Sequence, residues 1–121
     1  MRMEEIRHYL NALDTLSQEI RRSPEFAIIP GRLNRAELRH RFNLHRALTN
    51  LLHYATVHMV RADASDYDVE SEQWILDALD KASADVRESL ARPVPADVRD
   101  LVQRSQNLVN QILADIHTIA A

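Results

Sequence analysis

The sequence contains no cysteine, a single glycine and only four prolines in 121 residues. Without cysteine the chain can form neither disulfides nor thiolate metal sites. The scarcity of glycine and proline predicts long, uninterrupted elements. No apolar run approaches the roughly 20 residues that a transmembrane helix needs, and no apolar segment typical of a signal peptide follows the first residues. We therefore expect a cytoplasmic protein with no membrane contact.

The composition that remains is that of one globular domain spanning residues 1–121. Hydrophobic residues make up 45% of the chain and charged residues 27%, which is the balance of a protein with a buried core and a charged surface. The net charge of −3 argues against a general nucleic-acid-binding protein. We therefore expect a protein partner rather than a nucleic acid.

Apolar residues recur at intervals of three and four throughout the chain, the spacing of amphipathic helices. Pro24 ends the first predicted helix, Asn34 is a plausible N-cap of the second with Glu37 as its capping-box partner, and Pro95 suits the first turn of the fourth. The short later connections make neighbouring helices antiparallel. The sequence thus predicts an all-α protein, an antiparallel up-down-up-down four-helix bundle, with helices at about 3–22, 34–63, 67–91 and 95–120.

The longest connection, residues 23–33, is too apolar for a free loop. It contains Phe26, Ile28 and Ile29, and large exposed apolar patches are uncommon on monomers. We expect this segment to fold back over one end of the bundle as a plug. A part in a subunit interface is the alternative.

In this fold the charged side chains separate by end. Residues 63–80 hold seven acidic residues and no lysine or arginine. The opposite end gathers Arg21, Arg22, Arg32, Arg35, Arg39, Arg92 and Arg99. Arginines in the first turns of the second helix oppose the helix dipole, so the dipole does not explain them. Either they form an ordinary solvated surface, or they dock an acidic partner or phosphate groups; head-to-tail self-association is a further alternative.

Two other features stand out. Arg41 and His45 are four residues apart on the inward side of their helix, where they form either a ligand pocket with a carboxylate or a structural polar cluster. Trp74 falls off the core stripe of the third helix, either as a lone surface ring or as the anchor of a protein interface. The exposed tryptophan leads us to expect a homodimer.

Catalytic motifs give a second hypothesis. Arg35 and His40 match the Arg-x-x-x-x-His pattern, and in this respect the sequence resembles HEPN-type ribonucleases. Residues 45–52 are similar to the dimerisation helices of some sensor kinases. The first resemblance implies RNA cleavage and the second histidine phosphotransfer. No two histidines have the spacing of metal ligands, and no phosphate-binding glycine loop is present. We expect neither a metal nor a cofactor.

The sequence therefore favours a non-enzymatic protein–protein interaction module: a small adaptor, chaperone or inhibitor. Its contact candidates are Arg35, Arg39, Arg41, His45 and Trp74. The alternative is a helical-bundle enzyme or phosphotransfer protein that uses His40 or His45 with Arg35 or Arg41.

Overall fold

The structure, a computed structural model, describes residues 2–26, 34–64, 66–68 and 70–120. This part of the chain forms four α-helices and one 3-10 helix, and contains no strand; the elements are α1 (Arg2–Arg22), η1 (Pro24–Phe26), α2 (Arg35–Ala62), α3 (Gln73–Ser89) and α4 (Ala96–Ala120). The predicted all-α class is confirmed. None of these helices is both long and apolar enough to cross a membrane.

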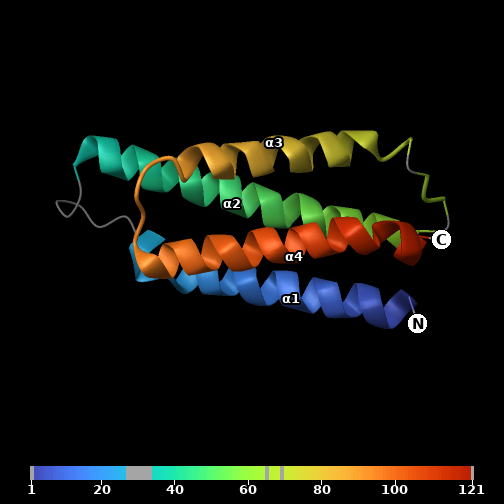
Figure 1. Ribbon diagram of the computed structural model, residues 1–121. Coiled ribbons are helices and arrows are strands. Elements are labelled where there is room, and N and C mark those ends of the chain that lie inside the picture. Colours follow the sequence, from blue (N-terminus) through green and yellow to red (C-terminus); the bar gives the residue numbers. More distant parts are fainter. Residues whose placement is uncertain (1, 27–33, 65, 69, 121) are drawn as a thin grey trace.

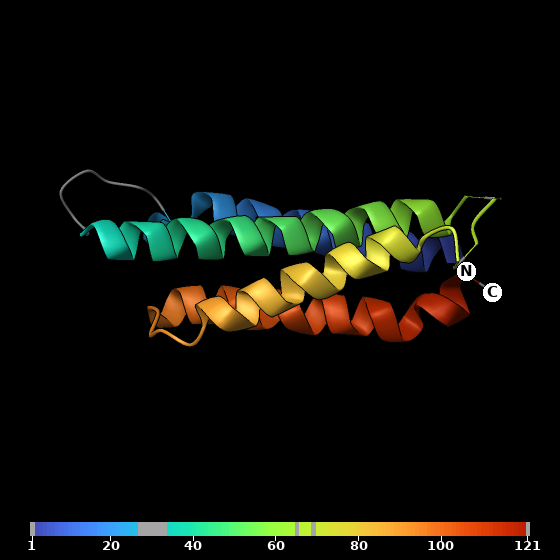
Figure 2. The ribbon, with the colours of Figure 1, turned by 90° about the horizontal axis from the view of Figure 1, so that it is seen from above.

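The four helices lie side by side along one long axis, and each runs against the one before it (Figure 1). In the perpendicular view α1 and α2 lie on one side and α4 on the other, and α3 runs obliquely from the end of α2 toward the start of α4 (Figure 2). Both views place the two ends of the chain and the α2–α3 connection at one end of the molecule. The first turns of α2 extend beyond the other three helices at the opposite end, which exposes its early arginines.

Three helices begin and end within one residue of the predicted ranges, but α3 does not. It begins at Gln73 rather than near residue 67. Glu72 is the N-cap residue, and its side chain makes no capping hydrogen bond. Its carboxylate accepts a hydrogen bond from Nε of Arg61 on α2 at 2.9 Å, and the helix begins directly after this residue.

The α2 N-terminus follows the prediction. The Asn34 side chain accepts a hydrogen bond from the Glu37 amide at 2.9 Å. At the other end of the chain, the amide of Arg99 donates to the Pro95 carbonyl at 2.9 Å, so α4 starts directly after this proline. Both starts use a residue outside the helix to bond an amide that the helix leaves without a partner.

The core follows the predicted stripes. All four helices contribute fully buried leucine, isoleucine or valine side chains, among them Leu13, Leu48, Leu79 and Ile112. Ser105, the one polar residue in the α4 stripe, is buried and donates from its hydroxyl to the Leu101 carbonyl at 2.8 Å. The hydroxyl thus has a partner within its own helix and adds no unpaired polar group to the core.

The connection between α1 and α2 is described only at its start. Phe26 is buried in η1, and its ring lies 5.3 Å from the ring of His45 on α2. This agrees with the predicted plug at that position. Ile28 and Ile29, which belong to the same prediction, lie outside the described residues.

Candidate functional site

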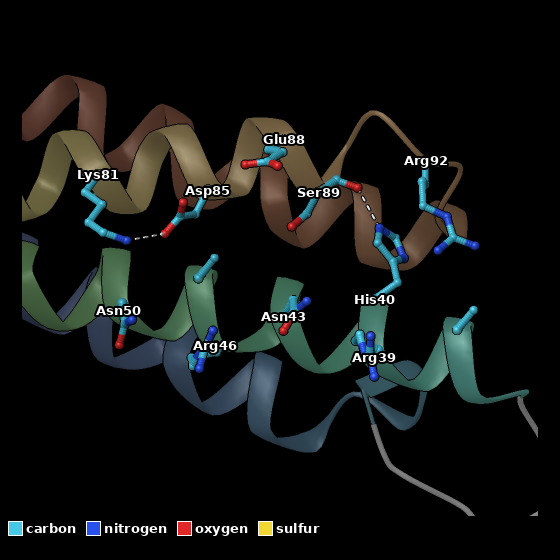
Figure 3. A pocket seen from close by; sticks show the side chains of 12 residues that line it. Arg39, His40, Asn43, Arg46, Asn50, Lys81, Asp85, Glu88, Ser89 and Arg92 are labelled. Atoms are coloured by element: carbon cyan, nitrogen blue, oxygen red, sulfur yellow. Dashed lines mark hydrogen bonds and ion pairs between the residues drawn. The ribbon is translucent and has the colours of Figure 1, made fainter.

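A groove of about 600 Å³ runs between the first half of α2 and the second half of α3. We call it the α2–α3 groove (Figure 3). Ten of its twelve lining residues are polar. They are Ala36, Arg39, His40, Asn43, Arg46, Ala47 and Asn50 from α2, and Lys81, Asp85, Glu88, Ser89 and Arg92 from α3 and the residues after it.

Helical spacing brings these side chains onto facing sides of the two helices. On α2, Arg39, Asn43, Arg46 and Asn50 follow one another at intervals of four, three and four, so they share one face. On α3, Lys81, Asp85 and Glu88 have the same spacing. The side chains on the α2 face are exposed, because the core stripe of α2 lies on another side of the helix.

Positive charge predominates in the groove, with four cationic side chains against two carboxylates. Lys81 forms an ion pair with Asp85 at 3.3 Å. Arg39, Arg46 and Arg92 form no ion pair with any other described residue. Arg46 instead lies over the ring of Phe42, 5.8 Å from its centre. Three arginines therefore remain available to an anionic ligand.

His40 has a structural bond inside the groove. Its Nε2 lies 2.6 Å from the carbonyl oxygen of Ser89, the last residue of α3 (Figure 3). Because a carbonyl can only accept, Nε2 carries the proton and donates it. The bond satisfies one of the carbonyls that the end of a helix leaves open. His40 is accordingly half-buried.

Trp74 extends the same side of α3. It precedes Lys81 by seven residues and Asp85 by eleven, which places all three on one face of the helix. Its side chain is 57% exposed, so the position off the core stripe is confirmed. The α2–α3 groove is thus basic toward the Ser89 end and is followed by an exposed indole toward the Gln73 end.

The other sequence candidates lie elsewhere. Arg35 is exposed in the overhanging first turn of α2 and does not line the groove. Arg41 and His45 are half-buried rather than inside the core. His45 lines a cleft of about 300 Å³ between α1 and α2, together with Asp14 and Ser17. Only Arg39 and Trp74, of the five contact candidates, share the side that carries the groove.

A second polar cluster closes the other end of the α2–α3 pair. Glu72 is only 3% exposed. Its Oε1 accepts a hydrogen bond from Nε of Arg61 at 2.9 Å and forms an ion pair with Nη2 of the same residue at 2.7 Å. Nη2 of Arg61 also lies 3.5 Å from the carboxylate of Asp66. The hydrogen bond with Glu72 is the main reason that the pKa of Arg61 is raised. This pairing lets a carboxylate be buried, which is very costly for an unpaired one.

His58 lies in the same cluster and has no exposed surface. Its ring packs edge-on against that of Tyr67, with 6.1 Å between the ring centres. Neither ring nitrogen has a hydrogen-bond partner among the described residues. Burial lowers the pKa of His58 below its ordinary value of 6.5, and the nearby negative charge of Glu72 opposes this shift. We call His58, Arg61, Tyr67 and Glu72 the closed corner.

The sequence indicated these features unevenly: it singled out Arg39 and Trp74. It did not find the burial of His58 or the part that Arg46 plays in the groove. The spacing of Arg39, Asn43, Arg46 and Asn50 could have indicated a polar face, but not which helix lies beside it.

The α1–α4 pair is joined by a bond from the Tyr9 hydroxyl to the Asp115 carboxylate. Burial, followed by this hydrogen bond, raises the pKa of Tyr9 to about 12. The phenol therefore keeps its proton at neutral pH and acts as a donor within the bundle. No group of three or more histidine, aspartate or glutamate side chains in the described part of the chain is arranged to hold a metal ion.

Comparison of the chain with protein-family models, with curated proteins and with solved structures finds no match.

Proposed function

We propose that this chain is a cytoplasmic, non-enzymatic protein–protein interaction module, an antiparallel up-down-up-down four-helix bundle that binds an acidic segment of a partner protein in the α2–α3 groove. The observation that carries the proposal is the set of three arginines, Arg39, Arg46 and Arg92, that line the groove without an ion-pair partner among the described residues. Arginine forks bind carboxylates in two-point contacts, which favours an acidic peptide as the ligand.

The dimensions of the groove side suit a helical or extended segment. Ser89 and Trp74 are fifteen residues apart on α3, which corresponds to about 22 Å. A partner helix of similar length can place carboxylates against Arg39 and Arg92 and an apolar side chain against the exposed indole of Trp74. Tryptophan and arginine are the residue types that most often dominate binding energy at protein interfaces.

The test is charge reversal inside and outside the groove. The double variant Arg39→Glu/Arg46→Glu changes two groove residues, and Arg7→Glu/Arg99→Glu makes the same change in net charge at two exposed positions that do not line it. Partners are captured from the native cell with the unchanged protein, identified and purified, and their affinities are then measured with all three proteins.

We expect the groove variant to bind at least about tenfold more weakly at low salt and the control to stay within about twofold. Equal losses in the two variants would show that only net charge matters. No loss in the groove variant would contradict the proposal.

The alternative is an enzyme that acts on a phosphate-bearing substrate, such as a HEPN-like ribonuclease or a histidine phosphotransfer protein. It is favoured by one observation: His40 lies among the groove arginines, and because Nε2 donates to Ser89, the neutral ring has Nδ1 as an acceptor. Cleavage of labelled RNA, or labelling by a phosphodonor, that is lost in His40→Ala would favour this alternative over the binding module.

A further inference from the structure

Two large apolar side chains are exposed on α2, far from each other along the helix. Phe42 is 51% and Val60 56% exposed. They are eighteen residues apart, which corresponds to about five complete turns, so both lie on the same line of the helix surface, about 27 Å apart. Neither the bundle core nor the α2–α3 groove includes them.

The side chains between them continue this line. Arg46, Thr49 and His53 are all exposed and follow Phe42 at intervals of four, three and four. Val60 follows His53 by seven. Alternation of three and four is the spacing at which one helix presents a seam to another. We call these five residues the α2 outer stripe: Phe42, Arg46, Thr49, His53 and Val60.

The α2 outer stripe is complementary to itself when a second copy runs antiparallel. A two-fold axis level with Leu51 brings Phe42 of one copy to the level of Val60 of the second copy, and Thr49 to the level of His53 of the second copy. Each end of the seam then closes with an aromatic–aliphatic pair. A parallel arrangement instead places Phe42 on Phe42 and Arg46 on Arg46.

The charge distribution also favours the antiparallel arrangement of the two copies of α2. The start of α2 carries exposed Arg35, Arg39 and Arg46, whereas exposed Asp63, Asp66 and Asp68 follow its end, and of these only Asp66 has an ion pair with a described residue, Arg61. An antiparallel second copy sets the arginine-rich end of each α2 near the acidic end of the other. The parallel arrangement sets like charges together, which costs affinity.

We propose that the occupant of the α2 outer stripe is a second copy of this chain, in an isologous antiparallel dimer in which α2 packs on α2. The inference does not rest on the proposed function, because the stripe lies beside the α2–α3 groove and shares only Arg46 with it. It also differs from the sequence expectation, since Phe42 and Val60, and not Trp74, form the contact between copies.

The absence of cysteine from the chain permits a direct test of direction. Thr49→Cys and His53→Cys variants are purified, mixed and oxidised. In a dimer of one Thr49→Cys copy and one His53→Cys copy, the two cysteines lie at the same level along α2 and can form a disulfide. In a dimer of two identical copies, the two cysteines lie about 6 Å apart along the helix axis. We expect a cross-linked species in the mixture and little with either variant alone.

Two controls complete the experiment. Gln103→Cys on α4, exposed and away from the stripe, should not cross-link to Thr49→Cys. Sedimentation equilibrium should show at least a tenfold weaker dimer for Phe42→Glu and for Val60→Glu, and no change for Met3→Glu, an exposed apolar residue on α1. Circular dichroism confirms that each variant remains helical.

Three results would overturn the proposal. They are a monomer at all concentrations up to about 100 μM, self-cross-linking of Thr49→Cys as efficient as that of the mixture, or a dimer that Phe42→Glu and Val60→Glu leave unchanged.

Discussion

The two ends of the α2–α3 pair treat charge in opposite ways. At the closed corner, the Glu72 carboxylate is buried and bound by Arg61, and the neutral ring of His58 is packed beside them. In the α2–α3 groove, the arginines point from exposed positions and lack ion-pair partners among the described residues. The same two helices thus carry one buried carboxylate whose charge is paired internally and one set of arginines whose charges are not.

This difference separates structural from functional polar residues. A buried carboxylate must be paired, so the Glu72–Arg61 bond is required by the fold. An exposed arginine needs no partner, and isolated surface charges add little to stability. Removing charges at the closed corner should therefore reduce stability, and removing them from the groove should change only what the protein binds.

The largest effect on stability is expected from Glu72→Ala. The change leaves Arg61 without its main partner and opens a gap where α2 meets α3. We expect the melting temperature to fall by roughly 5 °C or more. Glu88→Ala, at an exposed glutamate of the groove, is the matched control and should change it by less than about 2 °C. Similar falls in both variants, measured by calorimetry, would remove the distinction between the two ends.

A smaller effect, of opposite sign, is expected from His58→Leu. An apolar side chain of similar size removes two buried nitrogens that lack partners among the described residues, so we expect a gain of about 1 kcal/mol in the free energy of unfolding. His40→Leu, which loses the bond to Ser89, should instead destabilise the protein by a similar amount. Urea unfolding of the two variants measures both changes.

The same variant should alter the pH dependence of stability. Burial lowers the pKa of His58 below 6.5, so at lower pH the unfolded chain binds a proton that the folded protein does not. The neutral ring contributes fully to the free energy of unfolding above about pH 6.5. This contribution is lost as the pH falls toward the pKa of His58 in the folded protein. As the pH falls through this range, the free energy of unfolding of the unchanged protein should decrease, and that of His58→Leu should decrease less. Parallel pH profiles would contradict the assignment.

Sequence periodicity predicted the helices well because each carries a continuous apolar stripe at helical spacing. It failed at the start of α3, where a contact between Glu72 and Arg61, eleven residues apart, decides how the chain enters the helix. The helix propensities of the residues near Glu72 cannot reveal a contact with a residue on another helix. The burial of His58 was missed for the same reason: its ring packs against that of Tyr67, which lies beyond the end of α2, and the spacing within α2 does not reveal this contact.

The site was predictable only in part. The sequence indicated an arginine-rich end and an outlying Trp74, and it singled out Arg39. It also gave weight to Arg35, Arg41 and His45, which the structure places outside the groove. The grouping of Arg46 with Arg92 depends on how α2 and α3 pair, since these residues are forty-six positions apart in the chain.

The most direct measurement is the melting temperature of Arg39→Ala/Arg46→Ala/Arg92→Ala beside that of the unchanged protein, each with and without a glutamate-rich helical peptide of about 15 residues. A ligand that binds the folded state raises its melting temperature. We predict equal melting temperatures without peptide, and a rise with peptide in the unchanged protein alone. Two results would contradict the account. One is a triple variant whose melting temperature without peptide is as low as that of Glu72→Ala. The other is a triple variant whose melting temperature the peptide raises as much as that of the unchanged protein.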